Sequence, residues 1–245
     1  MLARMPRVAA TIMSDTRWGF VFLLVAALSI FASSAWAQPV PQQYVVIYVE
    51  FKPSDTKAGS RVLADLASHG LNSAGIIRFD VLQQVDRPNF FALFEIWTSA
   101  QTYAAYKNSS TTQAILTQLA PLLEAPLDER DGNLLEGSVT PRSGHAEARQ
   151  IFVITHLDII PTFVDQARPV LNTFVSDSTG DPGVQTFAML SWTPTTNHFQ
   201  LIEVFANQQA YDALVSAQHT VDFRQDLQPT IGAPYDERLY QFVNR

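Results

Sequence analysis

Apolar and more polar residues alternate in two short segments of the chain, 44–51 and 152–159. In the first segment Val45 and Ile47 fall on one face and Tyr48 falls on the other. A period of two is typical of a β-strand with one buried face. After each segment the apolar spacing changes to three and four residues, which predicts a helix that packs one stripe against the sheet.

Each predicted helix is followed by a glycine and by two further apolar segments. These segments are 76–84 and 90–97 in the first half of the chain, and 184–192 and 198–205 in the second half. A short polar turn separates the two segments of each pair. We therefore predict one β-hairpin in each half.

A second helix is expected after each hairpin. Ser99 in the first half and Asn207 in the second are placed as N-caps, because their side chains can accept hydrogen bonds from free backbone N–H groups. A last strand is then expected at 134–137 and at 239–243, which completes the order β-α-β-β-α-β in each half.

The two halves of the chain are copies of one another. The segment Pro-Leu-Asp-Glu-Arg that ends at Arg130 returns as Pro-Tyr-Asp-Glu-Arg ending at Arg238, 108 residues later, and the same offset relates Glu95 to Glu203. We interpret the Asp-Glu pair of each segment as a cap and turn. A fixed offset over most of each half indicates a duplicated domain.

The order of elements in each half is that of the ferredoxin-like fold, in which two helices cover one face of a four-stranded antiparallel sheet. The other face still carries large apolar side chains and cannot remain in water. We therefore expect an α+β fold, in which two ferredoxin-like (βαββαβ) repeats pair face to face and close a barrel-like body. The expected divisions are a signal peptide at 1–37, a first domain at 44–137, a linker at 138–150 and a second domain at 151–245.

The N-terminal segment has the pattern of a secretory signal. Residues 21–36 are almost all apolar or small, Arg17 precedes them, and an Ala-Trp-Ala site ends at Ala37. We expect cleavage between Ala37 and Gln38, a periplasmic or secreted protein, and no membrane contact after cleavage. An uncleaved anchor is the alternative, although the apolar run is slightly short for one.

Composition excludes several kinds of site. The chain has no cysteine, so it has neither disulfides nor thiolate ligands and nucleophiles. Its net charge is −7 and it has no basic run, which argues against nucleic acid as a partner. The five histidines show no metal-binding spacing, and no nucleotide-binding glycine motif occurs.

Both halves resemble the antibiotic-biosynthesis monooxygenase (ABM) domains, whose fold is the dimeric α+β barrel. The resemblance rests on Glu95-Ile96-Trp97 and Tyr103 in the first half, and on Glu203-Val204-Phe205 and Tyr211 in the second. It implies oxidation of electron-rich phenols or quinols by dioxygen without flavin, haem or metal, so no cofactor is expected. The protein would orient the ring, exclude water and move a proton.

Two histidines are candidates for that proton transfer, because an imidazole titrates near neutral pH. His219 stands at one of the helix positions where the family often has histidine; a helix-surface or capping role is the alternative. His156 lies on the strand face that Tyr48 occupies in the first half, and both are expected to point into the barrel. There His156 is either a proton-transfer group or a satisfied interior histidine, and Tyr48 is a candidate substrate contact.

Aromatic residues near the end of each hairpin are candidates for binding a planar ring. Tyr103 and Tyr211 are candidates for catalysis as well, and Trp97 with its counterpart Phe205 would form part of the wall. Plain core packing is the alternative for all four.

Two phenylalanines and two carboxylates recur on one face of the third strand of each half. Phe91, Phe199, Glu95 and Glu203 are therefore counted as candidate substrate contacts. A buried carboxylate needs a partner. A structural ion pair between each glutamate and the recurring arginine of the Asp-Glu-Arg segment is the favoured interpretation.

The leading hypothesis is an exported, cofactor-independent quinol-type monooxygenase whose partners are a small phenolic or quinol compound and dioxygen. The first alternative is a non-catalytic protein that binds an apolar or aromatic small molecule, and the second is a haem-binding or haem-degrading protein. Because the repeats would pair within one chain, we expect a pseudodimer that is a monomer or a weak homo-oligomer.

Overall fold

The computed structural model of the protein describes residues 40–139 and 149–243, which belong to one compact unit spanning Pro39–Arg245. The expected signal peptide and most of the expected linker lie outside the described residues, and the proposed domain limits stay predictions. Within the described part of the chain, no helix is long and apolar enough to cross a membrane.

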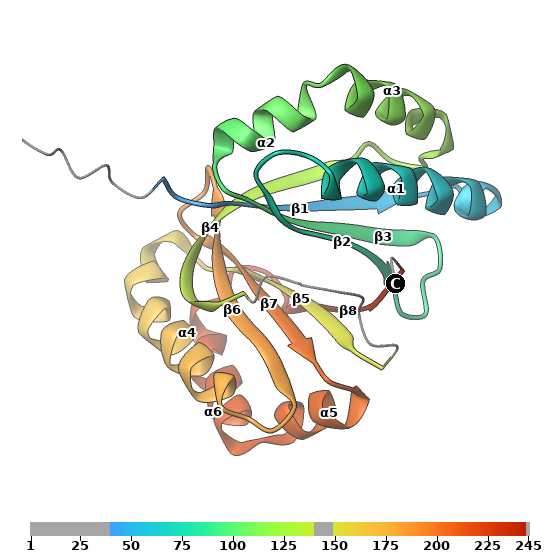
Figure 1. Ribbon diagram of the computed structural model, residues 1–245. Helices are drawn as coiled ribbons and strands as arrows, with labels where there is room; N and C mark the ends of the chain where they lie inside the picture. Colours follow the sequence, from blue (N-terminus) through green and yellow to red (C-terminus); the bar gives the residue numbers. More distant parts are fainter. Residues whose placement is uncertain (1–39, 140–148, 244–245) are drawn as a thin grey trace, which may run out of the picture. The chain divides into compact units, whose positions relative to one another are not determined.

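The first half follows the predicted order of elements, with its second helix divided in two (Figure 1). Its elements are β1 (Gln43–Glu50), α1 (Thr56–Leu71), β2 (Ile76–Gln84), β3 (Phe90–Trp97), α2 (Ala100–Lys107), α3 (Ser110–Leu119) and β4 (Asp128–Ser138).

The second half repeats this order. Its elements are β5 (Ile151–Asp158), α4 (Val164–Thr179), β6 (Val184–Thr193), β7 (His198–Phe205), α5 (Gln208–Ser216), α6 (Gln218–Leu227) and β8 (Asp236–Phe242). Ser99 accepts a hydrogen bond from the backbone N–H of Thr102, and Asn207 from that of Ala210, so the two predicted N-caps are confirmed.

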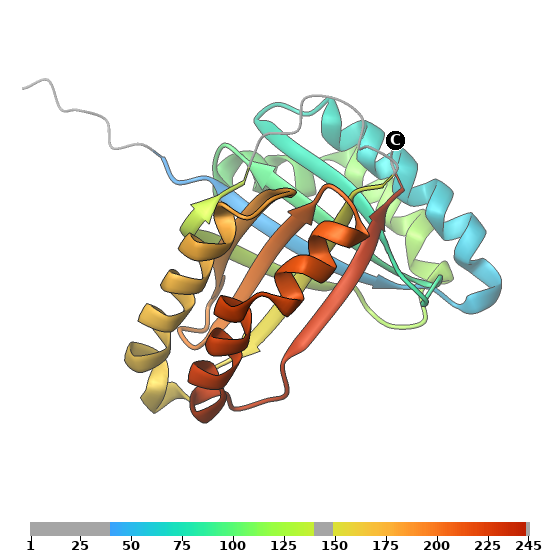
Figure 2. The ribbon, with the colours of Figure 1, turned by 90° about the horizontal axis from the view of Figure 1, so that it is seen from below.

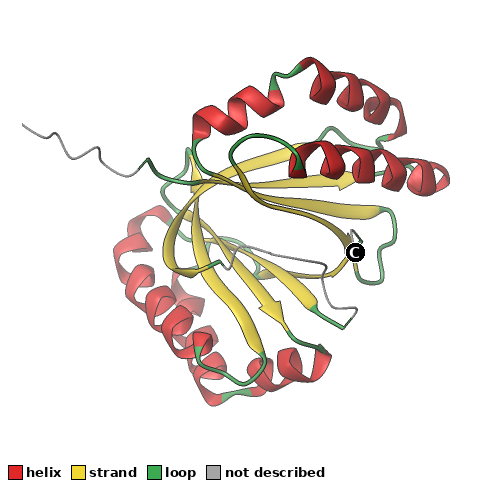
Figure 3. Ribbon diagram, viewed as in Figure 1, coloured by secondary structure: helices red, strands yellow, loops and turns green. Residues whose placement is uncertain are grey.

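The eight strands form one closed antiparallel barrel in the order β1-β3-β2-β8-β5-β7-β6-β4. The helices lie outside the strands, one set on each half of the barrel (Figure 3). This arrangement confirms the predicted fold class, because two ferredoxin-like repeats share a single barrel. Figure 2 shows α4 and α6 running side by side across the strands of the second half.

The repeats are joined by two seams, and each seam uses the last strand of one repeat and the second strand of the other. One seam is long: β4 pairs with β6 from Asp131↔Thr193 to Ser138↔Phe187. The other is short: β8 pairs with β2 only from Leu82↔Phe242 to Gln84↔Tyr240. Closure of the barrel therefore requires both halves.

The alternation of side chains along each strand separates the barrel interior from two outer cores. Val45 and Ile47 pack beneath the helices of the first half, whereas Tyr44 and Val46 face the interior. The interior combines residues of both repeats, among them Phe94 and Phe152, whose ring centroids lie 5.4 Å apart.

The interpretation of the Asp-Glu pairs as caps and turns is wrong. β4 begins at Asp128 and β8 at Asp236, so both Asp-Glu-Arg segments lie in strands that start several residues before the predicted 134 and 239. Arg130 is paired in register with Val46 of β1. Because side chains alternate along a strand, the aspartate and the arginine share one face and the glutamate takes the other.

The expected ion pairs between Glu95 or Glu203 and the recurring arginines are wrong for the same reason. Glu95 and Glu203 lie on the helix-facing side of their strands, whereas the arginines reach the interior cluster. Arg130 is paired with Asp128 at 2.7 Å, and Arg238 with Asp236 at 2.6 Å.

Candidate functional site

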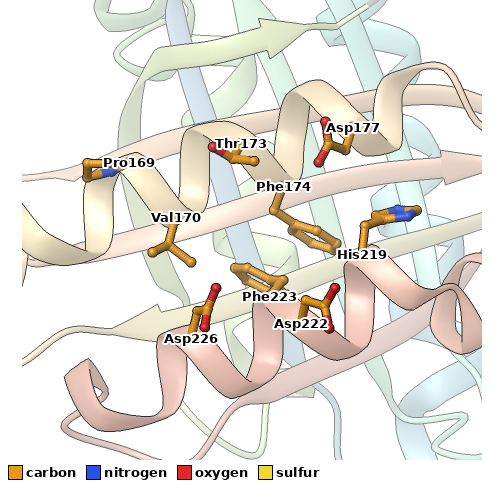
Figure 4. Close-up of a pocket in the computed structure, with 9 residues that line it drawn as sticks. All are labelled: Pro169, Val170, Thr173, Phe174, Asp177, His219, Asp222, Phe223 and Asp226. Carbon is orange, nitrogen blue, oxygen red and sulfur yellow. The ribbon is translucent and has the colours of Figure 1, made fainter.

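A groove of about 360 Å³ runs between α4 and α6 on the outer side of the second repeat (Figure 4). We call it the α4–α6 groove. Its residues used below are Phe174 and Asp177 of α4 and His219, Asp222, Phe223 and Asp226 of α6. Ligand pockets in proteins commonly enclose about 300–1,000 Å³, so the volume suits one small molecule.

Helix periodicity explains how these side chains come to line one groove. His219, Asp222, Phe223 and Asp226 are spaced by three and four residues, which places them on one side of α6. Phe223 meets Phe174 of α4 with ring centroids 3.8 Å apart and an interplanar angle of 3°, so the two rings are stacked. Both rings are buried, at 3% and 4% exposure, so the stack is the edge of the repeat's core and forms the floor of the groove between acidic side chains (Figure 4).

His219 lies at one end of the groove and is held by α4 and the loop that follows it. Its Nε2 is 3.2 Å from Oδ2 of Asp181 and 3.5 Å from the hydroxyl oxygen of Ser178. The contact with Asp181 is a close approach without a hydrogen bond, because Oδ2 of Asp181 has no hydrogen-bond partner among the described residues. Nδ1 contacts no hydrogen-bonding group among the described residues, so it is the nitrogen available to a ligand.

The chemistry of this groove is not repeated in the first half. At an offset of 108 residues, Thr111 stands for His219, Leu66 for Phe174 and Ile115 for Phe223. The first repeat instead has Tyr106, which stacks on Trp97 with centroids 4.6 Å apart and also packs near His69.

Glu95 is buried in the first repeat beneath α2. It accepts a hydrogen bond of 2.8 Å from the indole nitrogen of Trp97, and Tyr103 packs against the same indole. Burial raises the pKa of the Glu95 carboxyl to about 8, and the nearby charge of Glu129 acts in the same direction. The carboxyl therefore holds its proton at neutral pH.

Glu203 is the counterpart in the second repeat. It accepts a hydrogen bond of 3.2 Å from the hydroxyl of Thr155. Burial and the charge of Glu237 raise the pKa of Glu203 to about 8. Glu237 also accepts a hydrogen bond from the hydroxyl of Tyr211, so the carboxylate next to Glu203 has a partner of its own.

Tyr48 and His156 both point into the barrel, as predicted, and the structure shows that they meet there. The Tyr48 hydroxyl is hydrogen-bonded to Nε2 of His156, and Arg130 approaches Nδ1 of His156 at 3.0 Å. Burial, together with Arg130 and Arg238, lowers the pKa of His156 to about 3, so this imidazole is neutral at pH 7. It is a satisfied interior histidine.

The sequence-predicted site residues thus fall into four groups, two of which adjoin at one small pocket that both Tyr48 and Phe91 line. His219 lines the α4–α6 groove, and Tyr48 and His156 meet in the barrel interior. The other candidates lie between a sheet and its helices: Phe91, Glu95, Trp97 and Tyr103 in the first repeat, and Phe199, Glu203, Phe205 and Tyr211 in the second. Trp97 and Phe205 are fully buried, which is the environment of packed core residues.

Sequence reasoning did not find the residues around His219. Phe223 follows His219 by four residues, and this spacing on a helix indicates that the two side chains lie on the same face. Asp181 and Phe174 carried no such signal, because their proximity to His219 depends on how α4 packs against α6. Within the described residues, no cluster of three or more His, Cys, Asp or Glu side chains is arranged to hold a metal ion.

Comparison with protein families finds a match in the first repeat. Residues 43–118 match the antibiotic biosynthesis monooxygenase family. These residues run from β1 into α3 and include Glu95, Trp97 and Tyr103, three of the residues on which the resemblance rests. The search of curated proteins finds no match.

Solved structures share the fold over both halves of the chain. A monooxygenase candidate from Fusobacterium nucleatum superposes with a TM-score of 0.74 at 12% identity and covers 84% of this chain and 94% of its own. One from Lactobacillus acidophilus gives 0.66 at 11% identity over 82% and 94% of the two chains. An anthrone oxidase-like protein gives 0.63 at 11% over 83% and 92%. Residues 43–118 thus match the antibiotic biosynthesis monooxygenase family, and the chain as a whole has the fold of these structures, a dimeric α+β barrel formed here by two repeats of one chain.

Proposed function

We propose that the protein is a cofactor-independent monooxygenase that oxidises a small phenolic or quinol compound with dioxygen in the α4–α6 groove. The observation that carries the proposal is the His219–Asp181 contact of 3.2 Å beside the stacked Phe174 and Phe223. The family match supplies the type of reaction. The groove supplies an apolar floor and one basic nitrogen.

In the proposed reaction a substrate ring lies in the groove above the edge of the Phe174–Phe223 stack, and its hydroxyl donates a proton to Nδ1 of His219. Asp181 provides a counter-charge for the imidazolium that forms. The deprotonated ring is electron-rich and reduces dioxygen. One oxygen atom enters the ring, the other leaves as water, and the substrate supplies all the electrons.

Oxygen consumption by the purified chain against a panel of hydroquinones and phenols tests the proposal. We expect uptake above the non-enzymatic rate for at least one compound. Removal of a positioned general base commonly lowers a rate by about 10²–10⁴-fold, so His219→Ala should lower kcat by a factor in that range. The matched control is Thr111→Ala at the equivalent position of the first repeat, which should leave the rate unchanged.

Two outcomes would contradict the proposal. If no compound is consumed faster than in buffer, the protein does not catalyse this reaction on that class. If His219→Ala retains the full rate, the proton is transferred elsewhere, and the buried Glu95 and Glu203 become the groups to vary.

A non-catalytic binding protein is the second candidate, and it is favoured by the absence of the groove's histidine and phenylalanines from the first repeat. A ligand that binds only the folded protein adds about 2.7 kcal/mol of stability at a hundredfold excess over Kd. A raised Tm without oxygen consumption would support binding alone.

We also propose export, on the basis of the apolar segment 21–36 and the Ala-Trp-Ala site ending at Ala37. N-terminal sequencing of the protein recovered from its native compartment should begin at Gln38. An intact N-terminus on the exported protein would indicate an anchor instead.

A further inference from the structure

A pocket of about 170 Å³ lies beside Tyr48, on the part of the barrel built from β1, β2, β3 and β8. We call it the Tyr48 pocket. Its walls are mainly apolar and include Val49, Phe90, Phe91 and Pro126, while Arg238 and Tyr240 reach it from β8 of the other repeat. The pocket is complete only when the two repeats share one barrel. None of its lining residues lines the α4–α6 groove.

The hydrogen bonds around His156 determine where the hydroxyl proton of Tyr48 can go. An arginine side chain only donates hydrogen bonds. Because Arg130 approaches Nδ1 of His156 at 3.0 Å, and the amide nitrogen of Gln200 lies 3.5 Å from the same atom, Nδ1 is the acceptor. In a neutral imidazole Nε2 then carries the proton and donates it to the hydroxyl oxygen of Tyr48.

The hydroxyl proton of Tyr48 is therefore left to donate. Tyr48 makes no other hydrogen bond among the described residues. Burial raises the pKa of Tyr48 well above its usual value, so the hydroxyl remains protonated. Tyr48 is half-buried and lines the pocket, so this proton can be donated to a molecule that enters the pocket.

The charges near the pocket limit what that partner can be. Arg238 is already paired with Asp236 at 2.6 Å, and Arg130 with Asp128 at 2.7 Å. The carboxylates of Glu50 and Asp128 line the pocket as well. An anionic ligand would thus meet two like charges and find no arginine without a carboxylate partner.

We propose that the Tyr48 pocket binds a small uncharged molecule through a carbonyl oxygen, which accepts the hydroxyl proton of Tyr48. The apolar walls take the hydrocarbon part of the ligand. Arg130 and Arg238, whose guanidinium carbons lie 5.0 and 5.1 Å from the centroid of the Tyr48 ring, hold the ring in place. The ligand class is a compact ketone, aldehyde or quinone.

The test measures binding of three probes of similar size to the full chain by NMR titration. Acetophenone carries the carbonyl, ethylbenzene lacks the acceptor, and benzoate carries a charge. We expect acetophenone to bind most tightly. Loss of one neutral hydrogen bond weakens binding by about three- to tenfold. Tyr48→Phe should therefore raise the Kd of acetophenone by that factor and leave the Kd of ethylbenzene unchanged.

Three controls locate the effect. Tyr44→Phe makes the same change on the same strand and should leave the Kd of acetophenone unchanged. Ala125→Leu narrows the pocket without removing the hydroxyl donor, so it should raise the Kd of both acetophenone and ethylbenzene. His219→Ala should leave this binding unchanged, so a failure here is distinguishable from a failure of the proposed oxidation in the α4–α6 groove.

The proposal is overturned if no probe binds saturably, if Tyr48→Phe and the unaltered protein bind acetophenone equally, or if benzoate binds more tightly than acetophenone. It is also overturned if His219→Ala abolishes binding, because the ligand then occupies the groove. If Tyr48→Phe does not fold, the ratio of the acetophenone and ethylbenzene affinities in the unaltered protein decides: a ratio near one excludes the hydrogen bond.

Discussion

At the scale of single residues, the buried carboxyls of Glu95 and Glu203 link stability to pH. Each has a pKa of about 8 in the folded protein, against about 4.3 for glutamate in an unfolded chain. Between these values the folded state binds more protons than the unfolded state. The free energy of unfolding should therefore fall as the pH rises from about 4.5 to 8, by at most about 1.4 kcal/mol per pH unit for each carboxyl.

Replacing both residues with glutamine, as Glu95→Gln and Glu203→Gln, should flatten this decline, because the amide cannot ionise. Urea unfolding of the double variant and the unaltered protein between pH 5 and 8 measures the difference. Glu124→Gln changes an exposed glutamate and should leave the slope unchanged. Parallel curves for the double variant and the unaltered protein would show that neither buried carboxyl binds protons differently in the two states.

At the scale of secondary-structure elements, the second helix of each repeat depends on a side-chain cap. Ser99 and Thr102 form a reciprocal capping box at α2, whereas Asn207 alone caps α5. Ser99→Ala should lower the free energy of unfolding by about 1 kcal/mol, because the backbone N–H of Thr102 loses its acceptor.

The control is Ser68→Ala, on the exposed side of α1, where alanine has the better helix propensity and no cap is lost. In urea denaturation the midpoint of Ser99→Ala should lie below that of the unaltered protein, and the midpoint of Ser68→Ala should lie above it. Equal midpoints for both variants would mean that the capping box does not contribute to the stability of the barrel.

At the scale of the whole molecule, the two repeats depend on one another. Each contributes its last strand to the sheet of the other, and the interior core combines Phe94 and Ile96 with Phe152 and Ile154. Cutting the chain within 140–148 should yield halves that expose these side chains and aggregate or self-pair. Mixing the halves should restore a particle of the original mass, as measured by light scattering. Halves that each stay monomeric and cooperatively folded would contradict the shared barrel.

Much of the fold follows from local patterns, and the candidate site follows from them only in part. Alternation located β1 and β5, and the offset of 108 residues predicted that Tyr48 and His156 hold equivalent positions facing one interior. The strand character of the Asp-Glu-Arg segments was not predicted, because a charged triplet shows no alternation of apolar residues even when it forms a strand. The triplet in β4 is extended because β4 pairs with β1. Pairing between segments so far apart in the sequence cannot be predicted from a short stretch of residues.

The α4–α6 groove was beyond sequence reasoning for a related reason. Its position depends on the packing of two helices against one sheet, and the first repeat has no equivalent from which to infer it. His219 was identified through its helix position, whereas its partner Asp181 belongs to the loop after α4 and approaches only in the folded chain.

Tyr48 and His156 stand at equivalent positions and touch, so their contact lies where the two repeats meet about their common axis. In an assembly of two identical chains, a residue on such an axis meets its own copy and must be complementary to itself. Joining the repeats in one chain removes that constraint. One repeat can supply a phenol and the other an imidazole. A hydrogen bond between two different groups then replaces a contact between two identical residues. In the fused chain a mutation can therefore change one of the two residues on the axis and leave the other as it was. In a homodimer the same mutation changes both.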